Sequence, residues 1–364
     1  MSWLLSRRNF LIQASAVLSA SSLPGCSSTK LENDVLFGGS RYKDLSSNAL
    51  NYSLVRITPA SSEIKQAKTD FFPHGLAFIS GQSKLAFAFQ KIGAGAGLFD
   101  IDSMKLLEKV EPVKGRLFYG HGVCSQDNKL VYSTETAGSG DGAIGVRDAS
   151  SLEYLGDFPT YGQHPHECHL IENGAVLAVT NGGGSRSSGQ NACVCYIDVK
   201  SQKLLEKIEM VDERFNLGHM FALEGRQSIL VSAPRRGLDD SYLGAISMQR
   251  NLTTMDLIQH PTEVVNKIFG EALSVLAIPS RDLFVVTHPT PGMLTIWQLS
   301  TGSFVKSLDL PHVRGVALAS SHKGIWVSYG KQAELVLLSL DDFSLSQRLS
   351  NTYVTGSHLF QLPS

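Results

Sequence analysis

A short motif recurs about every 43 to 53 residues along this chain, and each copy is followed by two apolar segments of alternating pattern. The copies are anchored at His74, His121, His166, His219, Glu271 and Arg314. A second pair of segments follows within each unit, joined by a turn that contains Asp and Ser. Units of this length with four short strands are typical of β-propeller blades. The sequence therefore predicts an all-β propeller.

The two ends of the chain predict how the propeller closes. Residues 356–360 copy the first strand of a unit, but no further strand follows them. Residues 34–39, 53–57 and 63–65 resemble a second, third and fourth strand. A composite blade made from both ends would pair two otherwise open sheet edges. We therefore predict a seven-bladed propeller over residues 34–364.

The repeated anchor position predicts where functional side chains gather. The first strand of each blade lies nearest the propeller axis, so residues at its start surround one mouth of the central channel. Five of the chain's 11 histidines occupy this position. The predicted ring consists of His74, His121, His166, His219, Glu271, Arg314 and His358. The pairing register of the fourth and fifth blades stays open, and a shift of one residue would turn side chains away from the axis.

Second-strand ends and their loops lie on the same face as the ring, and they predict a polar rim. The main rim candidates are His164, Arg235, Arg236 and His288. Further candidates at equivalent positions are Arg41, Glu135, Gln163, Asn181 and Arg186.

Three interpretations of this ring remain open. The histidines could hold neighbouring blades together by bonding backbone groups. They could bind iron, copper or zinc through neutral imidazole nitrogens, with Glu271 as a further ligand. Alternatively, Arg235, Arg236 and Arg314 could clamp the carboxylates or phosphates of an organic ligand.

Other sequence motifs are weaker candidates for a functional site. Residues 164–169 are rich in ligand types, but strand alternation places His166 and Cys168 on one face and Glu167 and His169 on the other. The glycine-rich residues 182–185 lack the Lys-Ser/Thr and helix of a phosphate loop. No Gly-x-Ser-x-Gly nucleophile elbow is present, and Cys124 has no evident base partner.

The N-terminus predicts export. Arg7 and Arg8 precede an apolar run that is about 14 residues long and too short to span a membrane. Small residues then lead to Cys26, as in a lipoprotein signal. We expect residues 1–25 to be a twin-arginine lipoprotein signal peptide and residues 26–33 a lipidated tether. The mature protein would lie in the periplasm, anchored to the outer or inner membrane by the lipid on Cys26.

Composition excludes some partners. The formal net charge is −1, so the chain lacks the basic surface that nucleic-acid binding requires. No later segment is long and apolar enough to span a bilayer. We expect a monomer that contacts the membrane only through its N-terminal lipid.

Several segments together resemble a known bacterial family, that of the domain of unknown function 1513. They are residues 72–75, 120–122, 162–167 and 232–237, together with the export signal. The resemblance implies an exported propeller of the surface-layer-repeat type, with no assigned reaction. It also implies imelysin-type or di-haem proteins as partners and a role linked to iron uptake. The nitrous oxide reductase propeller is similar in gathering histidines, but Glu271 and Arg314 depart from its pattern.

The sequence therefore predicts an exported binding or scaffold protein for envelope metal handling, with iron as the expected metal. The alternative is an enzyme with a metal at the histidine-lined mouth, performing redox or hydrolytic chemistry. No residue can be assigned a catalytic role from the sequence.

Overall fold

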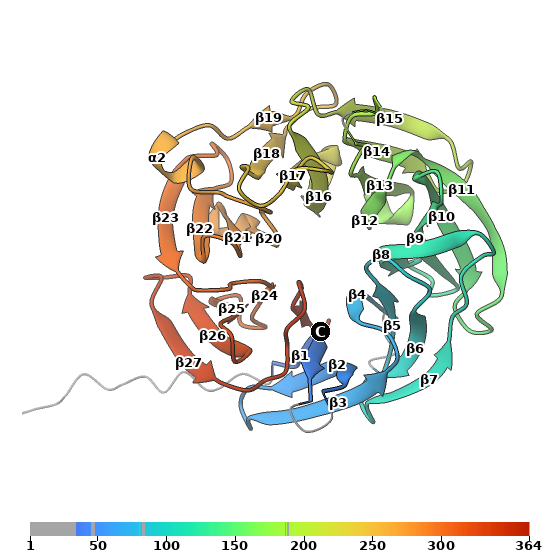
Figure 1. Ribbon diagram of the computed structural model, residues 1–364, viewed down its shortest axis with the longest axis horizontal. Helices are drawn as coiled ribbons and strands as arrows, with labels where there is room; N and C mark the ends of the chain where they lie inside the picture. Colours follow the sequence, from blue (N-terminus) through green and yellow to red (C-terminus); the bar gives the residue numbers. More distant parts are fainter. Residues whose placement is uncertain are drawn as a thin grey trace, which may run out of the picture. The chain divides into compact units, whose positions relative to one another are not determined.

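Seven four-stranded antiparallel sheets surround a central axis in the computed structural model of this protein (Figure 1). The structure describes residues 34–44, 48–79, 81, 84–185, 187 and 189–363. The predicted seven-bladed β-propeller is thereby confirmed. Residues 1–33, which include Arg7, Arg8 and Cys26, lie outside the described residues, as does Arg186.

The strands of the first four blades follow one another along the chain, except that the first blade also contains the C-terminal strand. The first contains β1 (Leu36–Lys43), β2 (Leu50–Thr58), β3 (Glu63–Thr69) and the C-terminal β28 (Phe360–Gln361). The second contains β4 (Pro73–Phe78), β5 (Leu85–Gln90), β6 (Ala96–Asp100) and β7 (Lys105–Lys109). The third contains β8 (Arg116–Cys124), β9 (Leu130–Ala137), β10 (Asp141–Asp148) and β11 (Tyr154–Gln163). The fourth contains β12 (Pro165–Ile171), β13 (Val176–Asn181), β14 (Cys193–Asp198) and β15 (Leu204–Glu209).

Three further blades complete the ring. The fifth contains β16 (Phe215–Ala222), β17 (Ser228–Pro234), β18 (Ala245–Gln249) and β19 (Asp256–Leu257). The sixth contains β20 (Val275–Ile278), β21 (Leu283–His288), β22 (Met293–Gln298) and β23 (Phe304–Asp309). The seventh contains β24 (Val316–Leu318), β25 (Gly324–Tyr329), β26 (Glu334–Ser339) and β27 (Leu345–Leu349). The helices among the described residues are single turns, such as α2 (Thr262–Val265), and none of them is long enough to cross a membrane.

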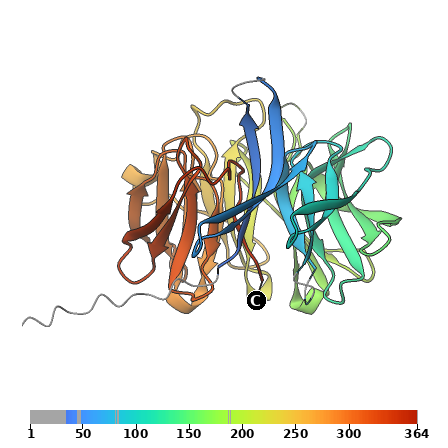
Figure 2. The ribbon, with the colours of Figure 1, turned by 90° about the horizontal axis from the view of Figure 1, so that it is seen from below.

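The first blade is the predicted composite. β28 pairs with β1 through Leu36 opposite Gln361 and Phe37 opposite Phe360. Figure 2 shows the N-terminal and C-terminal strands side by side in this blade. The C-terminal strand therefore occupies the innermost place, as the sequence predicted, and it joins the two ends of the described chain in one sheet.

Apolar side chains on both faces of each sheet bury themselves against the neighbouring blades. In one cluster, Val194 and Tyr196 of β14 pack with Leu217 and Leu230 of the fifth blade, and all four are fully buried. Because each blade has two such neighbours, its middle strands are apolar on both faces. This packing fixes the strands that carry the channel residues.

The inner strands of the second to fifth blades are interrupted by β-bulges. The pairing register shifts between Pro73 and Gly75, Phe118 and Gly122, Pro165 and Cys168, and Leu217 and Met220. A bulge leaves residues unpaired and changes the direction in which their side chains point. In each of the four strands the predicted ring histidine lies within the bulge.

Hydroxyl groups of the second strands satisfy backbone groups that the bulges leave unpaired. The Thr180 hydroxyl accepts a hydrogen bond from the Glu167 amide at 3.0 Å and donates to the Gly218 carbonyl at 2.6 Å. In the third blade, the Thr134 hydroxyl accepts from the His121 amide at 3.2 Å. The hydroxyls therefore stabilise each bulge, and Thr180 also connects it to the next inner strand.

Candidate metal centre

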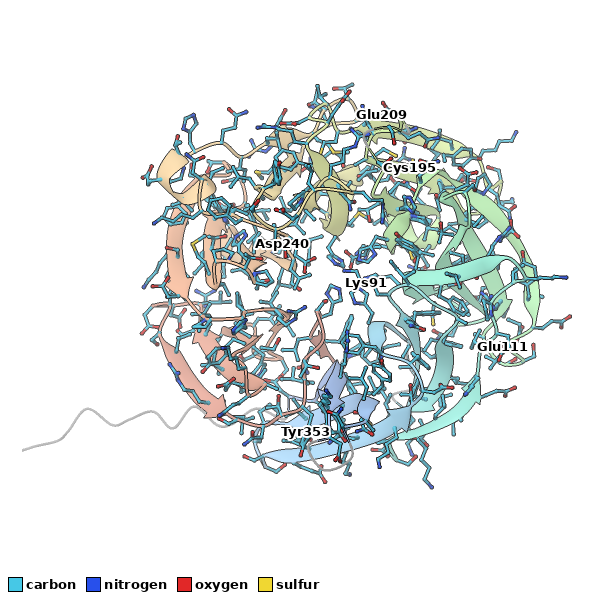
Figure 3. The ribbon with its side chains drawn as sticks, viewed as in Figure 1. Lys91, Glu111, Cys195, Glu209, Asp240 and Tyr353 are labelled. Atoms are coloured by element: carbon cyan, nitrogen blue, oxygen red, sulfur yellow. The ribbon has the colours of Figure 1, made fainter. Side chains whose placement is uncertain are left out.

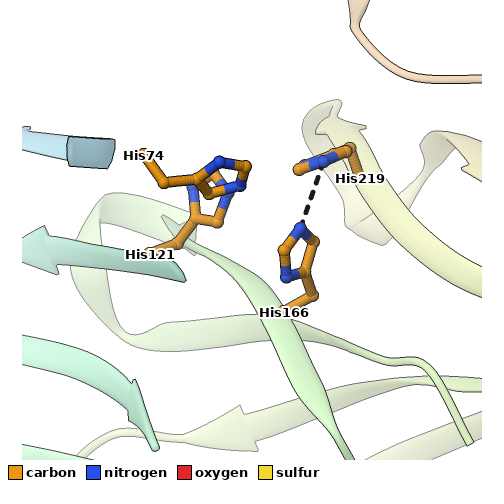
Figure 4. Close-up of side chains that lie close together, drawn as sticks. All are labelled: His74, His121, His166 and His219. Carbon is orange, nitrogen blue, oxygen red and sulfur yellow. Dashed lines mark hydrogen bonds between the residues drawn. The ribbon is translucent and has the colours of Figure 1, made fainter. Parts of the chain in front are cut away.

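Five histidines from five different blades converge at the centre of the propeller. We call this group the histidine cluster: His74, His121, His166, His219 and His358. Their ring centroids lie between 4.3 and 5.8 Å apart in the neighbouring pairs. Figure 4 shows four of these rings pointing toward one another from separate strands. All five residues are buried, with exposed fractions between 3% and 9%.

The spacing of the ring nitrogens fits a metal site. One nitrogen each of His74, His121, His166 and His219 lies within 4.8 Å of the other three. The Nε2 atoms of His166 and His219 are 3.1 Å apart, and those of His74 and His358 are 3.3 Å apart. Nitrogens bound at about 2.0–2.1 Å to a tetrahedral ion lie roughly 3.3 Å from each other. Each of these two close pairs, taken by itself, therefore matches the separation of two ligands of one ion.

Burial keeps four of these imidazoles neutral, those of His74, His121, His166 and His358. It is the main cause that lowers the pKa of His121 to about 3, although the Glu167 carboxylate raises it. Burial also lowers the pKa values of His74, His166 and His358 well below 6.5, and neighbouring histidines add to the effect. A neutral imidazole keeps a lone pair on one nitrogen, and this lone pair is what a metal ion binds.

Two hydrogen-bonding details identify available lone pairs. His166 Nδ1 lies 3.2 Å from the Tyr119 carbonyl oxygen, which only accepts hydrogen bonds. His166 Nδ1 therefore carries the proton, and its Nε2 keeps a lone pair that faces His219 Nε2 at 3.1 Å. His121 Nε2 is buried and has no hydrogen-bond partner among the described residues. A buried nitrogen without a partner is costly, and a bound metal ion would satisfy it.

Glu167 lies beside the cluster, which corrects the expectation from strand alternation. Its carboxylate oxygens lie 3.4 Å from His219 Nδ1 and 3.9 Å from His121 Nδ1. The bulge between Pro165 and Cys168 breaks the two-residue alternation, so Glu167 reaches the same region as His166. The Met220 amide donates to its Oε2 at 2.8 Å and fixes the carboxylate.

The charge of Glu167 suits the role of a carboxylate that orients metal-binding imidazoles. Burial raises its pKa, but the charge of His169 and contacts with His169 and His219 outweigh burial and hold this pKa well below 4.5. An anionic carboxylate that faces ring N–H groups orients the imidazoles and increases their basicity. Sequence reasoning missed this role because it requires the bulge.

Two cavities open at the channel mouth over the histidine cluster. The first, of about 170 Å³, is lined by His166 and His219 together with Tyr119, His164, Arg236 and Glu271. The second, of about 400 Å³, is lined by His74 together with Arg41, Glu271 and Arg314. Lys91 lines both cavities, and Figure 3 shows it near the propeller axis. The predicted ring residues Glu271 and Arg314 therefore lie at the mouth of the channel.

Other predicted rim residues are placed differently. Arg235 is buried, and its guanidinium donates to four backbone carbonyls, those of Gly184, Ser185, Gln190 and Glu213. It therefore holds a loop and lines neither cavity. His288 is fully buried and contacts the Thr295 hydroxyl of its own blade at 2.9 Å.

Three further rim candidates, Glu135, Asn181 and Gln163, have side-chain partners within the third and fourth blades. Glu135 pairs with Arg147 at 2.6 Å inside the third blade, and Asn181 accepts from the Thr160 hydroxyl at 2.6 Å. The Gln163 side chain lies 3.4 Å from the carboxylate of Asp141.

Lys91 was not among the predicted rim residues, although the sequence carried a signal for it. It directly follows β5, the second strand of its blade, and second-strand ends are the positions from which the rim was predicted. Tyr119 precedes His121 by two residues on β8, and its hydroxyl accepts from Arg236 at 2.8 Å. That contact joins the third and fifth blades across the mouth.

Comparisons with known proteins support the fold. The uncharacterized protein YncE of Salmonella typhi is 24% identical over 312 residues, which cover 82% of this chain and 79% of YncE. A protein of known structure from Lactobacillus plantarum is 15% identical, with a TM-score of 0.62, and the match covers 91% of this chain and 99% of that one. The periplasmic gluconolactonase PpgL of Pseudomonas aeruginosa is 13% identical, with a TM-score of 0.61 and the same coverage of both chains.

At these identities the two structures are similar to this chain in fold alone. The family described as "Protein of unknown function (DUF1513)" matches residues 73–360, which include all five residues of the histidine cluster. The family resemblance found in the propeller segments is thereby confirmed, and the chain belongs to the DUF1513 family.

Proposed function

We propose that this protein binds a first-row transition metal ion at the histidine cluster and serves as a binding or scaffold protein in metal handling at the cell envelope. The observation that carries the proposal is the convergence of five buried histidines, one of which has an unpartnered Nε2 atom. Imidazole ligands suit iron, copper and zinc, whereas calcium and magnesium prefer oxygen. The buried carboxylate of Glu167 next to the cluster supports a metal cation there.

The N-terminal sequence and the family resemblance support a location of this function at the cell envelope. Arg7, Arg8 and Cys26 favour export of the folded protein followed by lipid attachment. A metal site buried inside a closed propeller suits that route, because the ion can be loaded before export. Iron is the proposed metal, and imelysin-type or di-haem periplasmic proteins are the proposed partners.

The first experiment measures metal content by mass spectrometry in protein exported through its own signal. The test variant changes His74, His121 and His219 to Ala, and the control changes the exposed His312 to Asn. Asn tolerates the positive φ of 55° at position 312. We expect about one metal ion per chain in the wild type and control, and none in the folded triple variant. A wild type that stays empty after incubation with Fe²⁺, Cu²⁺ and Zn²⁺ would contradict the proposal.

A second candidate function is a metal-dependent redox or hydrolytic enzyme. The observation that favours it is the cavity beside His166 and His219, where Tyr119, His164 and Glu271 could contact a substrate. Turnover that requires the metal and disappears in the His121→Gln variant would support this candidate. Loss of partner or ligand binding without any turnover supports the binding function instead.

A further inference from the structure

The channel mouth carries more positive charge than its surroundings can balance. Four cationic residues line the two cavities over the histidine cluster: Arg41, Lys91, Arg236 and Arg314. None of them has an ion-pair partner within 4.0 Å among the described residues. The whole chain has a formal net charge of −1, so this concentration of cations is local.

The acidic residues at the mouth do not neutralise these cations. Asp70 lines the second cavity but pairs with Lys109 on β7, the outer strand of the second blade. Glu271 lines both cavities and forms no ion pair with a described residue. Four cations therefore face one unpaired carboxylate.

Two of the cations that line the cavities also have unused hydrogen-bonding capacity. The Nε atom of Arg314 is buried and has no hydrogen-bond partner in the described structure. Arg236 donates to the Tyr119 hydroxyl at 2.8 Å, which fixes its guanidinium and uses one of its five N–H groups. An unpaired buried guanidinium nitrogen is costly, and a carboxylate oxygen would satisfy it in bidentate geometry.

Lys91 lies at the channel mouth beside the histidine cluster, because it lines both cavities. Lys91 lines the first cavity together with His166 and His219, and the second cavity together with His74. A lysine so close to a proposed metal site would weaken binding of the cation unless an anion lies between them. Its position is therefore explained best by a negatively charged ligand over the cluster.

The arrangement of the cations indicates the class of anion. They come from the first, second, fifth and seventh blades, so they approach the mouth from different sides. Ile92, Phe71 and Phe72 add apolar walls. The larger cavity, of about 400 Å³, is within the size range of small-molecule sites. Separated cations with apolar surface between them fit an organic anion with several carboxylates better than one compact phosphate group.

We propose that the channel mouth binds a small organic polycarboxylate as a second ligand above the histidine cluster. This inference rests on the proposed function for the metal ion below the anion. Anion binding can nevertheless be measured without the metal, so the two proposals can fail separately.

The test is isothermal titration calorimetry with citrate at low ionic strength. The metal is first removed with a chelating resin, because dissolved EDTA is itself a polycarboxylate. The variants are Lys91→Gln and Arg314→Gln, and the matched control is Lys200→Gln, which removes an exposed lysine from the turn between β14 and β15. A titration with inorganic phosphate completes the set.

We expect the wild type to bind one citrate per chain, and each mouth variant to bind it about tenfold more weakly or worse. The control should bind citrate as the wild type does. Lys91→Gln should bind Zn²⁺ at least as tightly as the wild type, because a repulsive charge has been removed. That combination separates an anion-binding lysine from one that only maintains the fold.

Several results would overturn the inference. Wild-type protein that binds Zn²⁺ but not citrate excludes the polycarboxylate and leaves the metal site intact. Equal citrate affinity in the wild type and both mouth variants excludes Lys91 and Arg314 as ligands. Phosphate affinity equal to that of citrate assigns the mouth to simple anions. Citrate binding with no affinity for any metal supports the anion site but overturns the proposed function.

Discussion

Acidification should destabilise the metal-free protein, because four residues of the histidine cluster are held neutral in the folded state. Burial, opposed by Glu167, lowers the pKa of His121 to about 3, and burial lowers those of His74, His166 and His358 well below 6.5. In the unfolded chain each histidine returns to its ordinary pKa of about 6.5. Between the two values the unfolded state binds protons that the folded state does not, so the free energy of unfolding falls as the pH falls.

The size of this effect follows from the unfolded pKa. At pH 5.5, about one unit below 6.5, His121 lowers the free energy of unfolding by about 1.4 kcal/mol relative to neutral pH. His74, His166 and His358, whose pKa values burial also lowers well below 6.5, change the free energy of unfolding in the same direction.

His169 acts in the opposite direction and reduces this loss. Burial lowers its pKa, but the charge and contact of Glu167 outweigh burial and raise it above 6.5. Its stabilising contribution is therefore present below pH 6.5 and is lost as the pH rises through its folded pKa. Glu167 has a lowered pKa and contributes stability above about pH 4.5, so it does not change between pH 7.5 and 5.5.

Urea unfolding of metal-free protein at pH 7.5, 6.5 and 5.5 measures the effect. We expect the wild type and the His312→Asn control to lose several kcal/mol between pH 7.5 and 5.5. The His121→Gln variant should lose about 1.4 kcal/mol less over the same range, because it lacks one titrating group. A free energy of unfolding that is the same at pH 7.5 and 5.5 would refute the conclusion that burial keeps these four histidines neutral.

Four further predictions concern the metal, the bulges, a buried ion pair and the closure of the ring. Zn²⁺ at about 100 times its dissociation constant should stabilise the wild type by about 2.7 kcal/mol in thermal unfolding, and the His121→Gln variant by much less. Thr180→Val leaves the amide of Glu167 and the carbonyl of Gly218 without their Thr180 partner, so the free energy of unfolding in urea should fall by about 1–3 kcal/mol. The Thr180→Ser variant keeps the hydroxyl and should largely retain the wild-type stability. Arg147→Met should cost about 3–5 kcal/mol, because Glu135 is fully buried and pairs with Arg147 at 2.6 Å; a cost below 1 kcal/mol would show that Arg116, at 3.8 Å, replaces it. Deletion of residues 356–364 removes β28 and exposes the inner edge of β1, so circular dichroism and size-exclusion chromatography should detect unfolding or aggregation.

The fold could be predicted because the repeat is a local property of the sequence. Each unit carries its own alternating pattern and turn residues, and these determine four short strands wherever the unit lies in the chain. The composite blade could also be predicted, since β28 copies the first strand of a unit and the N-terminal strands supply the rest. Equivalent positions in repeated units must surround one axis, which is why the convergence of His74, His121 and His219 was predictable.

The sequence alone did not determine which neighbouring side chains reach that axis. Glu167 contacts the histidine cluster because a bulge breaks the alternation of β12, and bulges depend on pairing with the adjacent strand. Arg235 occupies a position equivalent to other rim residues, but its guanidinium turns to four carbonyls of a loop. Lys91 lines both cavities, but only packing of the blades brings it over histidines from distant segments. A change of one residue in strand register reverses the direction of a side chain, and that register is decided by tertiary contacts.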